Sequence, residues 1–187
     1  VLIRDTEQVK DSIVDFTYSL GFTGKPIKEP GIEARELVKD RLILIASPGF
    51  VIPCKKEKKQ EFPLVEPAAC LKLPFVLREP GSATRMLFED SIQREIPGGR
   101  LKTVAYLESQ EAIKEAVKTG LGVTVISQRA VQGELEAGFL KGYLINRLNL
   151  YRSFYLIWRE NRFLAPLTQL FLNFTLDYFS EPEGKNN

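Results

Sequence analysis

The spacing of apolar residues predicts alternating strands and helices through the second half of the chain. Residues 74–79, 101–108 and 122–127 are short runs rich in branched and aromatic side chains, which predicts strands. Segments 82–95 and 109–120 place apolar residues three or four positions apart, as an amphipathic helix does. Strands that alternate with helices of this length indicate βα units and a mostly parallel sheet.

The first half has a less regular pattern. It predicts a strand at 1–5, a helix at 6–14, a strand at 15–22, and one or two strands within 34–47. Because 41–47 is almost continuously apolar, we expect it to be buried on both faces of a sheet.

The remaining segments vary in regularity. Residues 48–74 hold five of the eleven prolines and the charged run 54–61, which is typical of a solvated loop. The other expected elements are a short helix at 68–73, a weak helical turn at 128–139, strands at 141–146 and 152–160, a long helix at 163–179, and a disordered tail.

Composition narrows the function classes. The chain has 187 residues, 44% of them hydrophobic and 27% charged, which is an ordinary globular mixture. Its net charge of +2 is too small to indicate nucleic-acid binding by this segment. No apolar run approaches the roughly 18 residues that a membrane span needs, and no signal peptide opens the chain, so we interpret it as soluble and cytoplasmic.

The chain contains no histidine, the commonest general base and metal ligand, which disfavours catalysis. Two cysteines, Cys54 and Cys70, are too few for a disulfide framework or a thiolate metal site. These counts disfavour a metal, a cofactor and enzyme activity. Ordinary thiols are the favoured interpretation, and a redox role for Cys54 beside Lys55 and Lys56 is the alternative.

The turn REPGSATR directly follows a predicted strand and opens a predicted helix. In α/β sheets ligands bind at this place, where the first helical amides lack partners and the helix dipole favours an anion. Gly81 lets the backbone approach a ligand closely, and the hydroxyls of Ser82 and Thr84 add donors. These features predict an anion site.

The alternative is that Ser82 is simply the helix N-cap. No capping box closes this turn, because the third helical position holds Arg85 rather than Glu or Gln. A cation in the first turn opposes the helix dipole by about 0.3–1 kcal/mol, which an anionic ligand would reverse. Arg85 also has Glu79 and Glu89 nearby as partners of its own.

Two further turns share this layout. Ser109 and Gln110 follow one strand, although Glu111 strengthens a simple capping role there, and Ser127 ends another strand. Each is a weak signal alone. Three polar turns on one sheet edge would face one cleft.

Several blocks taken in order resemble the effector-binding domain of LysR-type transcriptional regulators. They are PFVLREPGSATRMLFED, ESQEAIKEAVKTGLGVTVIS and SFYLIWRENRFLAPLTQLFLNF, and the resemblance runs from about Val1 to Phe179. It implies an α/β fold of the type 2 periplasmic-binding-protein class, with two Rossmann-like subdomains, two crossovers and a cleft between them. Residues 1–46 and 130–187 would form the first subdomain, and 47–129 the second.

The resemblance also implies a function. Such domains bind a small metabolite or inorganic anion, and binding alters how dimers and tetramers place their DNA-binding heads. Three turns would line the cleft, and their residues are Gly81, Ser82, Thr84 and Arg85, Ser109 and Gln110, and Thr23. Ala83 departs from a frequent glycine, and Ser127, also a candidate, stands where proline is usual.

The same resemblance places a winged helix-turn-helix, a linker helix and the domain's own first strand and helix before Val1. DNA would then be bound only through that preceding domain, in a homodimer or homotetramer, with RNA polymerase as a further partner. Helix 163–179 carries more apolar surface than one buried stripe needs, so it is either wholly core or partly a dimer interface.

Two other functions fit the fold. A solute-binding protein of a transport system would have a secretory leader or lipobox upstream. An enzyme would need Asp, Glu, Lys or Tyr as its base, since histidine is absent. The sequence names neither the effector nor the operator, nor whether transcription is activated or repressed.

Overall fold

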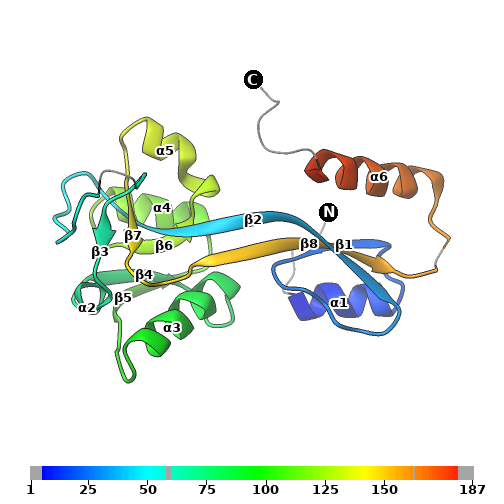
Figure 1. The fold of residues 1–187 in the computed structure, drawn as a ribbon, viewed down its shortest axis with the longest axis horizontal. Helices are drawn as coiled ribbons and strands as arrows, with labels where there is room; N and C mark the ends of the chain where they lie inside the picture. The colour runs from blue at the N-terminus through cyan, green and yellow to red at the C-terminus, as the bar shows by residue number, and fades with distance from the viewer. Residues whose placement is uncertain (1–5, 58–59, 162, 181–187) are drawn as a thin grey trace. The chain divides into compact units, whose positions relative to one another are not determined.

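The computed structural model describes residues 6–57, 60–161 and 163–180. The strand expected at 1–5, part of the charged run 54–61 and the predicted tail lie outside them. The chain divides into two compact units, residues 1–40 with 152–187, and residues 41–151. It passes between the units twice, once within strand β2 (Ile32–Ala46) and once near the start of β8 (Tyr151–Arg159; Figure 1).

The smaller unit, unit 1, has a helix on each face of its strands (Figure 1). Its elements are α1 (Thr6–Val14), β1 (Leu20–Thr23), the first part of β2 (Ile32–Ala46), β8 (Tyr151–Arg159) and α6 (Pro166–Ser180). In β8, Ile157 packs with Ile13 of α1, while Leu156 packs with Leu172 of α6. This alternation is the period of two that a strand imposes. In this unit β1 and β8 pair antiparallel, unlike the mostly parallel sheet expected from the βα units.

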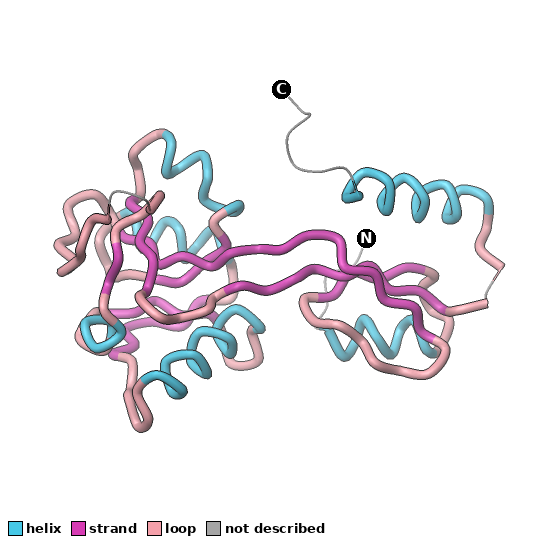
Figure 2. Tube along the Cα trace, in the orientation of Figure 1, coloured by secondary structure: helices cyan, strands magenta, loops and turns pink. Residues whose placement is uncertain are grey.

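The larger unit, unit 2, contains the βα units that the periodicity predicted. Its elements are the rest of β2, β3 (Leu64–Val65), α2 (Pro67–Cys70), β4 (Pro74–Arg78), α3 (Ala83–Glu95), β5 (Lys102–Leu107), α4 (Gln110–Lys118), β6 (Thr124–Ser127), the 3-10 turn η1 (Arg129–Val131), α5 (Gln132–Glu136) and β7 (Lys141–Ile145). Here a mostly parallel arrangement is correct, because β3, β4, β5, β6 and β7 share one direction and β2 opposes them. In Figure 2, drawn in the orientation of Figure 1, α3 lies below these strands and α5 above them.

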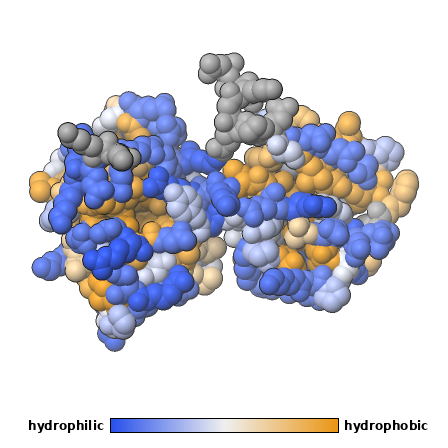
Figure 3. Space-filling view, viewed as in Figure 1, coloured by the Kyte–Doolittle hydropathy of each residue, from blue (hydrophilic) through white to orange (hydrophobic). Residues whose placement is uncertain are grey.

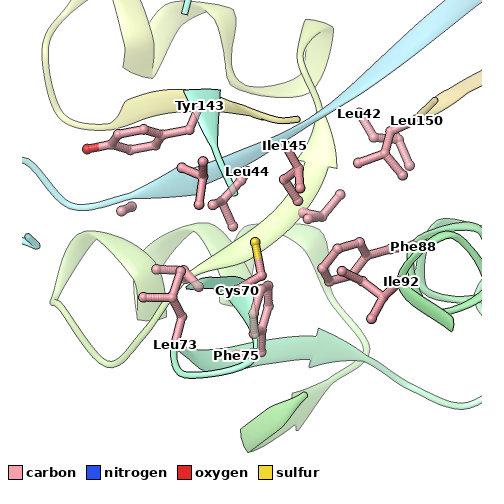
Figure 4. Close-up of a cluster of buried hydrophobic side chains, with 14 of the residues drawn as sticks. Leu42, Leu44, Cys70, Leu73, Phe75, Phe88, Ile92, Tyr143, Ile145 and Leu150 are labelled. Atoms are coloured by element: carbon pink, nitrogen blue, oxygen red, sulfur yellow. The ribbon is translucent and has the colours of Figure 1, made fainter. Parts of the chain in front are cut away.

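The core of unit 2 lies on both faces of β2. Leu42, Leu44 and Ala46 belong to one hydrophobic cluster, and Ile43 and Ile45 belong to another. All five are at most 2% exposed, which confirms that this run is buried on both faces. The first cluster includes Phe88 and Ile92 of α3, shown with Cys70 in Figure 4, and the second includes Ile113 and Val117 of α4.

The residue bounds of the two compact units differ from those of the predicted subdomains. Residues 41–46 and 130–151 lie in unit 2, because β7 pairs with both β2 and β3. The assignment of either unit to an effector-binding subdomain remains a prediction.

Candidate functional site

The three predicted turns of unit 2 follow strands that end at the same edge. Strands β4 and β5 run parallel with Arg78 opposite Leu107, so both carboxyl ends are level. Strand β6 joins β4 in parallel through Phe75 and Val123, and the Val76 amide donates to the Val123 carbonyl at 2.9 Å. The turns after β4, β5 and β6 therefore lie along one edge, as the sequence pattern predicted.

The turn after β4 is a tight reversal that ends at the N-terminus of α3. Gly81 has a φ of +91°, and the Ser82 amide donates to the Glu79 carbonyl at 3.3 Å. Proline at the second position and glycine at the third suit a type II turn, in which the third residue needs positive φ. Glycine is used here for its backbone conformation, because a Cβ at Gly81 would meet no atom within 4 Å.

Ser82 occupies the N-cap position of α3 but makes no side-chain capping hydrogen bond. The residue is only 9% exposed, and the first turn of the helix contains no acidic side chain. The positive end of the α3 dipole is therefore not offset by Ser82 or by a carboxylate of that first turn. Thr84, the second residue of α3, is also buried.

Arg85 is held by groups of the protein itself. Its Nε donates to Glu89 Oε1 at 2.9 Å, and its Nη1 donates to the Arg78 carbonyl at 3.2 Å. Its guanidinium also lies 4.7 Å from the centre of the Tyr106 ring. Of the two carboxylates near it in sequence, Glu89 is thus the hydrogen-bonded partner, one helical turn away.

Arg78, which sequence reasoning did not select, is a second cation at this turn. It binds Glu79 through two hydrogen bonds of 2.7 Å, from Nε to Oε2 and from Nη2 to Oε1. These hydrogen bonds hold the pKa of the Glu79 carboxyl below its ordinary value. The sequence did contain a signal for it, an arginine at the end of a strand and next to the Glu-Pro-Gly-Ser turn.

Ser109, at the start of α4, differs from Ser82. Its Oγ accepts a hydrogen bond from the Ala112 amide at 3.4 Å, and Glu111 follows in the first turn. Ser109 is therefore an ordinary N-cap in an exposed position, and Gln110 begins the helix behind it. Ser127 is the buried last residue of β6.

Thr23 belongs to unit 1. It is the last residue of β1, is 3% exposed, and donates from Oγ1 to the Lys25 carbonyl at 2.9 Å. Its predicted contact with the effector remains a prediction.

Other features that could bind a ligand or react lie away from these turns. A hollow of about 460 Å³ in unit 1 is lined by Phe16, Gly31, Arg159, Glu160, Asn161 and Phe163, none of which was a predicted site residue. Burial raises the pKa of the Cys70 thiol to about 12, which makes a reactive thiolate unfavourable there. Over the described ranges no three His, Cys, Asp or Glu side chains gather to hold a metal ion, and no helix is long and apolar enough to cross a membrane.

Comparison with known proteins gives a consistent result. The profile of the LysR substrate binding domain matches residues 1–180. The RuBisCO operon transcriptional regulator of Acidithiobacillus ferrooxidans is 29% identical over 163 residues, covering 87% of this chain and 49% of the relative. The transcriptional activator CmpR of Synechocystis is 30% identical over 174 residues, covering 92% of this chain and 54% of the relative. The chain thus spans about half the length of these relatives.

Solved structures share the fold. The regulatory domain of Synechocystis CcmR in complex with 2-PG has a TM-score of 0.76 at 23% identity, over 94% of this chain and 80% of that one. The effector binding domain of QuiR in complex with shikimate has a TM-score of 0.73 at 20% identity, over 95% of this chain and 79% of that one. These likenesses confirm the type 2 periplasmic-binding-protein class. The chain belongs to the LysR substrate-binding domain family, the non-enzymatic effector-binding domain of LysR-type regulators.

Proposed function

We propose that this domain senses a small anionic metabolite or inorganic anion at the turn between β4 and α3. The observation that carries the proposal is Ser82, a buried serine at a helix N-cap that makes no capping hydrogen bond. Its hydroxyl and the first amides of α3 are donors at the positive end of a helix dipole. An anion is the ligand that such donors favour.

The relatives support a small ligand of this class. The CcmR domain was solved with 2-PG and the QuiR domain with shikimate. We propose Thr84, Ser109, Gln110, Ser127 and Thr23 as further contacts, as the resemblance implies. Arg85 is assigned a positioning role, because its guanidinium is hydrogen-bonded to Glu89 and the Arg78 carbonyl.

The proposal extends to the whole regulator. Effector binding would be passed to a DNA-binding domain outside this chain, in a cytoplasmic homodimer or homotetramer. RNA polymerase would be a further partner of that regulator.

Binding of 2-PG and of inorganic sulfate by Ser82→Ala and Thr84→Val variants tests the proposal. Each variant should bind the anion more weakly than the unaltered chain does. The expected loss of binding free energy is about 1–3 kcal/mol, the scale of a hydrogen bond to a charged group. Isothermal titration calorimetry at constant ionic strength measures the change. Equal affinity in both variants and the unaltered chain would refute the anion site at this turn.

Ser109→Ala is the matched control for stability, because Ser109 is the N-cap of the neighbouring helix. It should lower the free energy of unfolding by roughly 0.5–2 kcal/mol through its lost capping bond. Ser82→Ala should leave that free energy nearly unchanged, because Ser82 makes no such bond. Urea unfolding separates the two outcomes.

A further inference from the structure

Arg78 lies at the start of the connection from β4 to α3 that contains Ser82. It is the last residue of β4, two positions beyond Val76, so both side chains leave the strand on one face. Val76 packs in the cluster that contains Ile113 and Val117 of α4. Arg78 therefore lies on the α4 face at the carboxyl end of β4, level with the end of β5.

The fork of the Arg78 guanidinium already holds a carboxylate. Nε and Nη2 donate to the two oxygens of Glu79, each at 2.7 Å, which is the two-point geometry by which arginine binds carboxylates and phosphates. The side chains of Arg78 and Glu79 are 25% and 33% exposed. A pair so accessible to water contributes little to stability, so another anion can replace Glu79 without a large loss.

The two arginines at this turn differ in how firmly they are held. Arg85 is 15% exposed at its side chain and is bound by Glu89 from its own helix and by a backbone carbonyl. Arg78 is paired with the side chain of the adjacent residue, which begins a turn of proline and glycine. Arg78 is thus the cation that a ligand can recruit.

We infer that Arg78 is the charged effector-binding residue of this turn, and that Glu79 occupies its guanidinium until an anion takes the place of the Glu79 carboxylate. The ligand class is an anion with two oxygens on one atom, such as a carboxylate or a phosphate. The Ser82 hydroxyl and the α3 amides would bind its remaining oxygens. The inference rests on the proposed function. It adds that Glu79 competes with the anion for Arg78 and so lowers the affinity of the domain for that anion.

A double-mutant cycle tests the competition. Binding of 2-PG, inorganic phosphate and inorganic sulfate is measured by calorimetry for the unaltered chain, Arg78→Gln, Glu79→Gln and the double variant, at constant ionic strength. Arg78→Gln should weaken binding about tenfold or more, the scale of a lost two-point contact. Glu79→Gln should tighten binding about threefold or more, and that gain should vanish when Arg78 is also replaced, because Glu79 acts through Arg78.

The controls are Arg94→Gln, an arginine near the other end of α3, and Glu115→Gln on α4, both expected to bind as the unaltered chain does. Circular dichroism verifies the fold of every variant. An equal gain from Glu79→Gln with and without Arg78 would mean that Glu79 acts as a general negative charge, which overturns the inference. Unchanged binding in Arg78→Gln also overturns it, whereas the proposed function then stands. Absence of binding in both the unaltered chain and Glu79→Gln would refute the anion site itself.

Discussion

Ser82 and Ser109 illustrate how identical residues in identical local positions differ once the structure is known. Both follow a parallel strand and begin a helix, yet only Ser109 forms the capping hydrogen bond. The sequence indicated this contrast, because Glu111 suits the α4 dipole and Arg85 opposes that of α3. The hydrogen-bond partner of Arg85 was left open by the sequence, since both Glu79 and Glu89 lie close to it along the chain.

Gly122 controls how closely β6 approaches β4. A Cβ at this position would lie 2.3 Å from the Pro74 carbonyl oxygen, the acceptor of the Val123 amide. Gly122→Ala should therefore lower the free energy of unfolding by about 1–3 kcal/mol or more, because backbone must shift. Chemical denaturation measures the change.

Gly133 in α5 is the control for this substitution. A Cβ there meets no atom within 4 Å, so Gly133→Ala should raise stability by about 0.4–1 kcal/mol, as alanine favours helix. If Gly122→Ala were as stable as the unaltered chain, the close β4–β6 contact would be wrong.

At the scale of elements, the long periodic helices were predicted well and the short or irregular segments were not. The predicted helices at 82–95 and 109–120 differ by one or two residues from α3 and α4. β3 was missed because two residues have no period to detect. β1 begins at Leu20 rather than at residue 15, because Phe16 adopts a φ of +65° that interrupts extended backbone.

Lys114 shows packing that periodicity alone does not indicate. It lies on α4 and is 8% exposed, with Nζ 2.9 Å from both Glu134 of α5 and Glu111, and 3.4 Å from the Ala130 carbonyl. Lys114→Met should lower the free energy of unfolding by about 1–3 kcal/mol, because these hydrogen bonds to charged groups are lost. Lys118→Met, on the more exposed side of the helix, should change it by less than about 0.5 kcal/mol.

The stabilisation by this pair has a defined pH window. The Glu134 hydrogen bond raises the pKa of Lys114 above 10.5, and the Lys114 hydrogen bond lowers the pKa of Glu134 below 4.5. The contribution of the pair to the free energy of unfolding is therefore complete between pH 4.5 and pH 10.5, the ordinary pKa values of the two groups. It is lost as pH drops through the lowered pKa of Glu134 and as pH rises through the raised pKa of Lys114. The free energy of unfolding of Lys114→Met should therefore approach that of the unaltered chain at low and at high pH. A difference between the two that stays constant with pH would contradict the pairing.

At the scale of the whole molecule, helix α6 has one buried face and a second apolar stripe. Leu172 and Thr175 are buried in unit 1. The exposed apolar side chains repeat at helical spacing; they are Leu167, Leu170, Phe171, Phe174 and Tyr178. Figure 3 shows that the surface in this region of the molecule is hydrophobic. The interpretation of the helix as wholly core is therefore wrong for this stripe, and a role in a homodimer remains a proposal.

Self-association through this stripe is a testable consequence. Sedimentation velocity over increasing concentration should show dimers or larger species for the unaltered chain, because contiguous apolar surface is costly in water. Leu170→Glu together with Phe174→Glu should yield monomer without loss of stability, since these side chains are 66% and 63% exposed. Gln169→Glu, on a polar position of the same helix, should leave association unchanged. Monomer alone at every concentration would contradict the proposal.

The sequence by itself determined the βα order, the run of β2 that is buried on both faces, the sheet edge that carries the polar turns, and the family resemblance. The first three follow from periodicity and turn chemistry, which act between near neighbours along the chain, and the resemblance rests on blocks of sequence in a given order. Only the tertiary structure decided that β1 and β8 pair antiparallel, that Glu89 holds Arg85, and that Glu79 fills the fork of Arg78. Strand direction depends on partners far apart in sequence, and the choice among nearby charges depends on side-chain geometry.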